Sequence, residues 1–445
     1  MRRSIVTRRR VLVLTVLLTA TAVVTLRPVT KRSASSIGLM ADVGGPMKLV
    51  VCSVNSARRS ALRNAKLVSQ IINVLPPNVR VLLLVNDRGA FRVAANPWPD
   101  RVSFVELPED VPITIWPQDP FVVLSPKGGS VELLVSNQFE RASDAQMAVA
   151  IASHLGWQYK KSTLSFEGGN IVSDGELVFI GANTIRHNAV LLGQPEHEVV
   201  EEFERQFGRT LYVVDHVPQV VAHIDLILTP LGRGVVALAD SRWGARLAEQ
   251  ALAEDPGGVA AFERYCERMF LGHADITQVR DVEGATIRSP TIVGRTSEAV
   301  AASRAIAPQL DRIAEGMRAA GYDVVRVPFL FPGPPITRSA ATSEDSAQGN
   351  FKNGEGATGH DTDPPRSQPG YPYLTYNNVL LETSDGKDTV YLPQYGWPLF
   401  DDVARSTWQS TGFAVRTVPG FTTSAMYLGS LRCCVKVLSR EHDYD

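Results

Sequence analysis

The chain has 445 residues, enough for one large domain or two of average size, and its 44% hydrophobic and 20% charged content is that of a globular protein. Residues 1–32 hold seven arginines and one lysine but no acid, so the remainder carries 37 basic against 46 acidic residues. That net charge of −9 excludes a basic surface for nucleic acid. Without CxxC spacing or companion histidines, the four cysteines indicate neither a zinc site nor a disulfide scaffold: Cys52, Cys266, Cys433 and Cys434.

The first 32 residues are predicted to be an export signal or a membrane anchor. MRRSIVTRRR carries five arginines and precedes sixteen uncharged residues, 11–26, which is the basic and apolar order of a signal peptide. Ala20-Thr21-Ala22 offers a cleavage site, and residues 7–12 weakly resemble a twin-arginine signal. Sixteen residues fall short of the ~20 that a spanning helix needs. We expect an exported protein, either secreted or anchored through residues 11–26.

From Lys48 onward, short strands alternate with helices. Apolar β-branched runs predict strands at residues 48–54, 79–85, 120–124, 131–135, 210–214, 225–229, 234–239 and 322–327. Helices are predicted at 57–75 and at 298–320, the second with Ser297 as its N-cap and Gly321 as its stop. The β-β-α-β order recurs about five times, which favours a single α/β domain of stacked similar units over residues 45–440.

One segment interrupts this order. Residues 334–370 contain almost no large apolar residue and many Gly, Ser, Asp and Pro residues. Such a segment cannot offset its ordering entropy by burial, so we expect a disordered surface loop inserted within the domain.

Four short motifs contain residues capable of chemistry. They are IWPQDP at 115–120, SFEGGN at 165–170, AHIDL at 222–226 and GSLRC at 429–433. Each has a plain structural explanation on its own: a turn before proline, a glycine turn, a hydrogen-bonded pair on one face of a strand, and a core cysteine that opens a strand. Only their combination indicates a function.

The combination suits chemistry on a guanidinium group. A thiol nucleophile needs a partner such as His223 to move protons near neutral pH. Carboxylates beside that pair would raise the pKa of the thiol, so they need another purpose. Asp119 and Asp225 can clamp a planar guanidinium bidentately over the sulfur, while Glu167 orients His223.

The order Asp-Pro, EGG, HxD and a late G-x-x-x-C resembles the guanidine-modifying enzyme superfamily, the deiminases and amidinotransferases. FEGGNIVSDGELVFIG and AHIDLILTPLGRGVVALAD are similar to its glycine-rich and histidine strands. YLTYNNVLLE and VYLPQYGWP resemble agmatine deiminase-like and bacterial peptidyl-arginine deiminase-like members. The likeness covers residues 48–438 apart from the insertion. It implies the pentein fold, an α/β propeller of five ββαβ units.

The resemblance places the nucleophile on Cys433, which leaves Cys434 to packing on the opposite strand face. It places the general acid and base on His223, and the supporting glutamate on Glu167. The guanidinium carboxylates become Asp119 and Asp225, and we also expect Trp116 and Asn170 to contact substrate.

Three departures leave the substrate open: Arg432 where many agmatine deiminase-like members have histidine, Asn170 where several relatives have aspartate, and Gln118 in place of an arginine. A second motif, GHAD at 272–275, mimics the histidine motif of the superfamily; we expect it to be a structural turn.

The resemblance implies hydrolytic deimination of a guanidino compound to a ureido product and ammonia, through a covalent intermediate on Cys433 and with no metal or organic cofactor. The substrate can be free arginine, agmatine, a methylated arginine or a peptidyl arginine, and we favour a small compound. An amidinotransferase, a catalytically silent protein that binds a cationic ligand, and a thiol hydrolase acting on amides remain alternatives.

Overall fold

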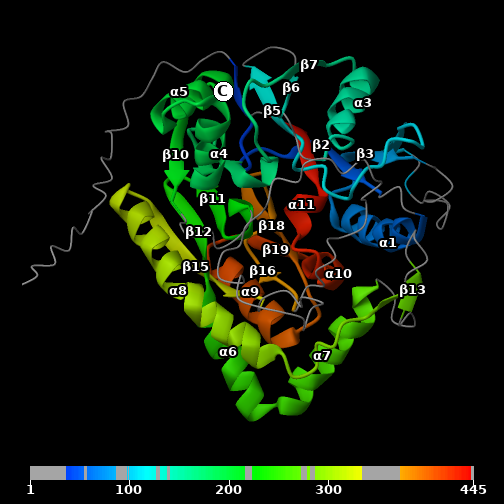
Figure 1. Ribbon diagram of the computed structural model, residues 1–445, viewed down its shortest axis with the longest axis vertical. Coiled ribbons are helices and arrows are strands. Elements are labelled where there is room, and N and C mark those ends of the chain that lie inside the picture. The colour runs from blue at the N-terminus through cyan, green and yellow to red at the C-terminus, as the bar shows by residue number, and fades with distance from the viewer. Residues whose placement is uncertain are drawn as a thin grey trace, which may run out of the picture. The chain divides into compact units, whose positions relative to one another are not determined.

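The computed structural model (Figure 1) describes residues 37–54, 58–86, 98, 100–126, 131–137, 141–215, 223–271, 278–280, 286–332 and 371–441. The predicted export signal at 1–32, the GHAD motif at 272–275 and the predicted loop at 334–370 lie outside these residues. Among the helices that are described, none is long and apolar enough to cross a membrane.

Five sheets share one pattern, in which an antiparallel strand pair is followed by one or more helices and then by a strand parallel to the second of the pair. In the sheet nearest the N-terminus, β5 (Phe121–Pro126) and β6 (Glu132–Val135) precede α3 (Ala145–Leu155) and β7 (Gln158–Lys161). The strand β1 (Ile37–Leu39) adds to its edge beside β5. In the next sheet, β8 (Ile171–Ser173) and β9 (Leu177–Gly181) are followed by α4 (Ala182–Leu192), α5 (Glu196–Phe207) and β10 (Thr210–Val214).

The third sheet has the longest connection. Its pair is β11 (Leu228–Gly232) and β12 (Val235–Asp240), and the helices are α6 (Ser241–Glu254), α7 (Pro256–Phe270) and α8 (Thr296–Ala319). The hairpin β13 (Gln278–Arg280) and β14 (Thr286–Arg288) lies between α7 and α8. The parallel strand is β15 (Asp323–Leu330), and β16 (Leu374–Thr375) pairs with it antiparallel.

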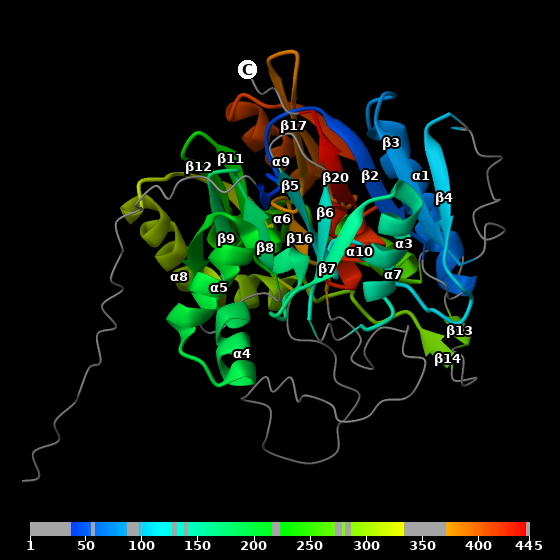
Figure 2. The same ribbon diagram turned by 90° about the horizontal axis from the view of Figure 1, so that it is seen from above.

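The last two sheets complete the series. One contains β17 (Leu380–Ser384), β18 (Lys387–Pro393), α9 (Pro398–Ser410) and β19 (Ala414–Val418). The other joins both ends of the domain, because β20 (Lys436–Arg440) pairs antiparallel with β2 (Met47–Ser53), as Figure 2 shows. There α1 (Arg58–Val74) leads to β3 (Arg80–Val85), and β4 (Val102–Glu106) follows.

The mixed α/β prediction is therefore confirmed, and the strand pairs repeat the predicted β-β-α-β order. Among the described strands, no pairing links one sheet to another, so the sheets do not form a closed barrel. Their arrangement as a five-unit propeller stays a prediction.

The predicted N-cap of the long helix α8 is wrong. The helix begins at Thr296, one residue before Ser297, and Arg295 occupies the cap position without a side-chain cap. The carboxylate of Glu263 in α7 instead accepts hydrogen bonds from the backbone N–H groups of Gly294 and Thr296. A side chain from another helix thus satisfies donors that local sequence signals assign to a serine. Gly321 does follow the helix, with a φ of 92°.

The inner strands explain where the core lies. Every residue of β2 except Lys48 is buried, and β3 is buried from Val81 to Val85. Strands buried on both faces read as continuous apolar runs, which is the pattern of VRVLLLV. The polar motifs of the sequence fall immediately before such strands, so the core holds their backbone in fixed positions.

Candidate active site

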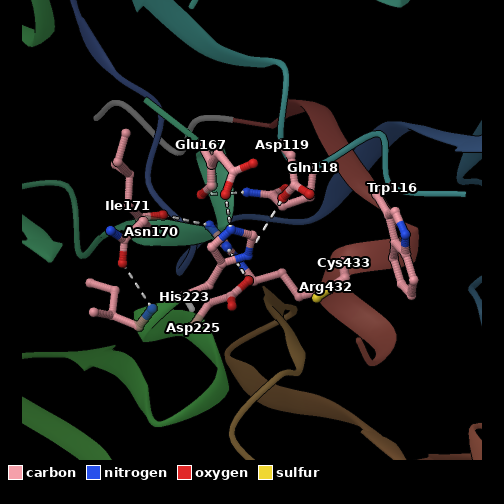
Figure 3. Close-up of polar contacts among 12 residues, drawn as sticks. Trp116, Gln118, Asp119, Glu167, Asn170, Ile171, His223, Asp225, Arg432 and Cys433 are labelled. Carbon is pink, nitrogen blue, oxygen red and sulfur yellow. Dashed lines mark hydrogen bonds and ion pairs between the residues drawn. The ribbon is translucent and has the colours of Figure 1, made fainter. Parts of the chain in front are cut away.

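Each sheet contributes a polar side chain from the residues just before the first strand of its antiparallel pair. Asp119 precedes β5, Asn170 precedes β8, Asp225 precedes β11 and Cys433 precedes β20. Asn378 holds the same position before β17. Figure 3 shows that the four motifs found in the sequence converge, with Asp119, Glu167 and Asp225 gathered around the imidazole of His223.

Two local structures differ from the predictions. His223 and Asp225 were expected on one face of a strand, but residues Ile224–Leu226 form a 3₁₀ turn, η2, with His223 at its start. Cys433 was expected to open a strand, but Leu431–Cys434 form the one-turn helix α11, and β20 begins only at Lys436. The turn η2 and the helix α11 thus place the polar residues of their motifs just before β11 and β20.

His223 is held by two carboxylates. Its Nε2 is hydrogen-bonded to Oε2 of Glu167, and its Nδ1 lies 3.8 Å from Oδ1 of Asp119. Burial lowers the pKa of His223, but Asp119 and Glu167 outweigh burial and raise it to about 9. Burial conversely favours the neutral form of Glu167, yet the charge of His223 lowers the pKa of Glu167 to about 2. At neutral pH the pair is therefore an imidazolium and a carboxylate.

Gly169 permits this arrangement. It lies in the 3₁₀ turn η1 (Gly168–Asn170). A Cβ atom at Gly169 would lie 2.3 Å from Nδ1 of His223 and 3.1 Å from Oδ1 of Asp119. The EGG motif is thus a requirement for close approach between His223 and the backbone beside it.

Asp119 is buried and pairs with Arg141, an arginine that lies in none of the four motifs. Oδ2 of Asp119 accepts a hydrogen bond of 2.7 Å from Nη2 of Arg141, whose Nε donates to Asp144 at 2.8 Å. The other oxygen of Asp119, Oδ1, is buried and accepts no hydrogen bond from the described residues.

Asp225 is arranged in the same way. Its Oδ2 accepts a hydrogen bond of 2.8 Å from Nη1 of Arg432, and its Oδ1 is buried with no hydrogen-bond partner in the described part of the chain. Arg432 is further fixed by Asp42 at 2.9 Å and by the carbonyl of Ile171 at 2.9 Å. Burial raises the pKa of Asp225, and Arg432 opposes this effect. An arginine of the protein thus occupies one oxygen of each carboxylate, and the predicted clamping of a guanidinium by Asp119 and Asp225 stays a prediction.

Cys433 lies beside these carboxylates. Its backbone N–H donates to Oδ1 of Asn378 at 3.2 Å, and Nδ2 of Asn378 donates to the carbonyl of Asp225 at 3.4 Å. Burial, and then the negative charges of Asp225 and Asp119, raise the pKa of the Cys433 thiol well above its usual range. Cys434 packs in a different apolar cluster from Cys433.

Trp116 and Asn170, the two further residues predicted to contact substrate, both make close contacts within the protein. Trp116 packs so closely on Gly429 that a Cβ atom there would lie 2.2 Å from its ring. Asn170 is buried; its Oδ1 accepts from the N–H of Ile224 at 3.1 Å, and its Nδ2 donates to Asn183 and Thr184 at 2.6 Å each. Asn170 therefore holds η2 in place, and contact of either residue with a substrate stays a prediction.

Within the described ranges, no group of three or more His, Cys, Asp or Glu side chains is placed to hold a metal ion. The site instead presents one thiol, one imidazolium and two carboxylates, each of which has one oxygen that accepts no hydrogen bond from the described residues.

Comparison with known proteins places this geometry in context. No protein-family model and no curated protein matches the sequence. The structure is similar to C. jejuni agmatine deiminase, with a TM-score of 0.54 and 13% identity over 90% of this chain and 95% of that one. It is also similar to the agmatine deiminase of Enterococcus faecalis (TM-score 0.53, 12% identity, 91% and 96% covered) and to a putative peptidyl-arginine deiminase (0.52, 14%, 92% and 100%). The chain has the fold of the guanidine-modifying enzymes.

The fold shared with these proteins confirms the resemblance drawn from the motifs, at the level of the fold alone. It also explains which site residues the sequence did not reveal. Asn378 lies just before the first strand of the antiparallel pair β17 and β18, the position that Asp119, Asp225 and Cys433 hold before other pairs. Comparison of the residues at this repeated position could therefore have identified it. Arg141 had no such signal, because it reaches Asp119 from a segment that precedes α3.

Proposed function

We propose that the protein is a deiminase that hydrolyses a guanidino compound to a ureido product and ammonia. One observation carries the proposal: two buried carboxylate oxygens, Oδ1 of Asp119 and Oδ1 of Asp225, accept no hydrogen bond from the described residues. Buried carboxylate oxygens that accept no hydrogen bond are costly unless a ligand satisfies them, and Oδ1 of Asp119 has only the imidazolium of His223 at 3.8 Å. A guanidinium cation presents several N–H donors in one plane and suits two acceptors on separate side chains.

The charges around Cys433 suit a reaction that begins only when this cation binds. In the free protein, burial and the carboxylates Asp225 and Asp119 raise the pKa of the thiol, so it is protonated. A bound guanidinium neutralises the two carboxylates and thereby lowers that pKa. The thiol proton then passes to solvent, and the thiolate forms beside the guanidinium carbon.

The covalent steps use Cys433 and His223. The sulfur attacks the guanidinium carbon to give a tetrahedral adduct, whose remaining N–H groups stay on Asp119 and Asp225. The imidazolium of His223, stabilised by Glu167, donates its proton to the leaving nitrogen, and ammonia departs from a thiouronium intermediate. The neutral imidazole then takes a proton from water as the water attacks the same carbon. When the adduct collapses, the carbon–sulfur bond breaks and the hydroxyl proton passes to the sulfur, which restores the thiol of Cys433 and releases the ureido product.

The finer features of the proposal rest on the sequence. The substrate is a small cationic guanidino compound such as arginine or agmatine, with peptidyl arginine as the other class. The five sheets surround the site as a propeller, and residues 1–32 export the protein. The fold supports the reaction class, because the similar solved structures include agmatine deiminases.

The test is a substrate panel. Purified protein is incubated with arginine, agmatine, ω-N-methylarginine and a peptide that contains arginine, and both ammonia and ureido product are measured. We expect equal amounts of the two products from at least one compound, and none from Cys433→Ala. Binding of a guanidino compound without either product would contradict the proposal and favour a binding protein.

A further inference from the structure

A second polar site lies beside the candidate active site. A cavity of about 30 Å³ is bounded by β-strand residues of several sheets, mostly apolar ones such as Val123 and Val437. Its charged lining consists of three cations and one acid: Arg432, Lys436, Arg440 and Asp42. Arg432 separates the cavity from the active site, because it lines the cavity and also bonds to Asp225.

The single carboxylate in this lining is already occupied. Oδ1 of Asp42 accepts hydrogen bonds from Nε and Nη2 of Arg432, and Oδ2 of Asp42 accepts one of 2.8 Å from the N–H of Ser173. Glu382, the other acid near Arg440, bonds to the N–H of Met47 and the hydroxyl of Tyr391. No acid is left to neutralise Lys436 and Arg440 directly within the described part of the chain.

Both cations have donor capacity to spare. The ammonium of Lys436, which is 6% exposed, makes one long hydrogen bond of 3.4 Å to the carbonyl of Gln118 and lies 5.5 Å from the centre of the Phe121 ring. An ammonium can donate three hydrogen bonds. Arg440, 8% exposed, directs Nη1 and Nη2 to backbone carbonyls, whereas its Nε is buried without a partner among the described residues.

The surroundings therefore do not compensate the two buried charges. Burial, followed by the charge of Arg432, lowers the pKa of Lys436 to about 7 despite the nearby acids. Burial likewise lowers the pKa of Arg440 to about 10. A buried cation without a counter-ion is unfavourable, and an anion in the same cavity would relieve both residues at once.

We propose that this cavity binds a small inorganic anion of the size of chloride, held by Lys436 and Arg440. A volume of about 30 Å³ has room for one halide or about two water molecules, since one water needs roughly 10–15 Å³ of such space. Larger anions such as gluconate do not fit. The inference is independent of the proposed function, because none of the residues Cys433, His223 and Glu167 lines the cavity.

Thermal unfolding tests the proposal in solution. The full chain is unfolded in sodium chloride and in sodium gluconate at the same ionic strength and pH. We expect chloride to raise the Tm by about 1–2 °C with a saturable dependence on concentration, because a ligand that binds only the folded state stabilises it. Lys436→Met should abolish the saturable increase, whereas Lys387→Met, which removes an exposed lysine, should preserve it.

Crystals soaked in sodium bromide provide a direct readout that does not depend on the folding of a variant. We expect an anomalous peak in the cavity of the unaltered protein, within hydrogen-bonding distance of Nζ of Lys436. Ordered water without a bromide peak would overturn the proposal, and so would an equal chloride effect in Lys436→Met.

Discussion

Two adjacent cysteines occupy opposite environments in this protein. Cys433 belongs to the apolar cluster around β11 and β12, and its thiol lies close to the charges of Asp225 and Asp119. Cys434 belongs to the larger cluster around β2 and β3, and its thiol lies 3.9 Å from the hydroxyl of Ser424. The short helix α11 causes the division, since it turns by about 100° between successive residues.

The pKa values of both thiols are raised, but both carboxylates of the site contribute to the increase at Cys433 alone. For Cys434, burial raises the pKa, the hydrogen bond with Ser424 lowers it and the charge of Asp119 raises it further, to about 12 overall. For Cys433, the carboxylates add to the effect of burial, and a bound cation can cancel their contribution. A cation bound between Asp119 and Asp225 would therefore lower the pKa of Cys433 more than that of Cys434.

Replacement of each cysteine should give the largest contrast. Cys433→Ala removes the proposed nucleophile and should reduce turnover of the best guanidino substrate by about a thousandfold or more. Cys434→Ala should retain turnover to within about threefold, because its thiol faces the core. Steady-state release of ammonia measures both. If Cys434→Ala were the inactive variant, the assignment would be reversed.

Labelling should separate the thiols by the charge of the reagent. The measured quantity is the alkylation rate with cationic chloroacetamidine divided by the rate with neutral iodoacetamide. This ratio should be at least about tenfold higher for Cys433 than for a model thiol, because Asp119 and Asp225 attract cations. Asp119→Asn should reduce this preference, while Asp402→Asn, at an exposed helical position, should not. Mass spectrometry of peptides locates the label. An unchanged preference in Asp119→Asn would reject the role of that carboxylate.

The pH dependence should report the imidazole beside Cys433. The pKa of His223 is raised to about 9, above the ~6.5 of an unfolded chain, so its contribution to stability is complete below about pH 6.5 and is lost as the pH rises through 9. Glu167→Gln removes one of the carboxylates that raise this pKa. The basic limb of the pH–rate profile should therefore shift to lower pH by about one unit.

The same variant should show a smaller loss of stability between pH 6.5 and 9, measured by urea unfolding. Glu298→Gln, at an exposed position of α8, provides the control. A basic limb at the same pH in Glu167→Gln and in the unaltered protein would exclude His223 as the group that titrates there.

The smallest expected effect concerns stability at Cys434. Cys434→Ser places a more polar hydroxyl in an apolar cluster and should cost about 1 kcal/mol of unfolding free energy. Cys433→Ser should cost less, because the new hydroxyl has polar neighbours. Urea unfolding at neutral pH compares the two variants, and equal losses would show that the two environments do not differ in polarity.

Strands were the most predictable part of the fold. Residues 81–85 of the run VRVLLLV are all apolar because both faces of β3 are buried there, so the strand can be assigned from its own residues. The start of α8 was missed for the opposite reason, since Glu263 on another helix caps it. Local patterns cannot show a cap that comes from a distant residue.

The candidate site follows the same rule. Cys433, His223, Glu167, Asp119 and Asp225 stand in short motifs, and the structure brings them together. The hydrogen bonds of the two carboxylates could not be predicted. One oxygen of Asp119 bonds to Arg141 and one oxygen of Asp225 bonds to Arg432, and these partners are far apart in sequence.

The pairing of β20 with β2 has a consequence for synthesis. Cys433 is fixed by the strand that follows it, and that strand pairs with β2, which leaves the ribosome about 390 residues earlier. During translation, β2 and β20 cannot pair until Arg440 has emerged, so the sheet has one open edge until then. The segment that carries Cys433, the proposed nucleophile, therefore gains its fixed position only when β20 pairs with β2.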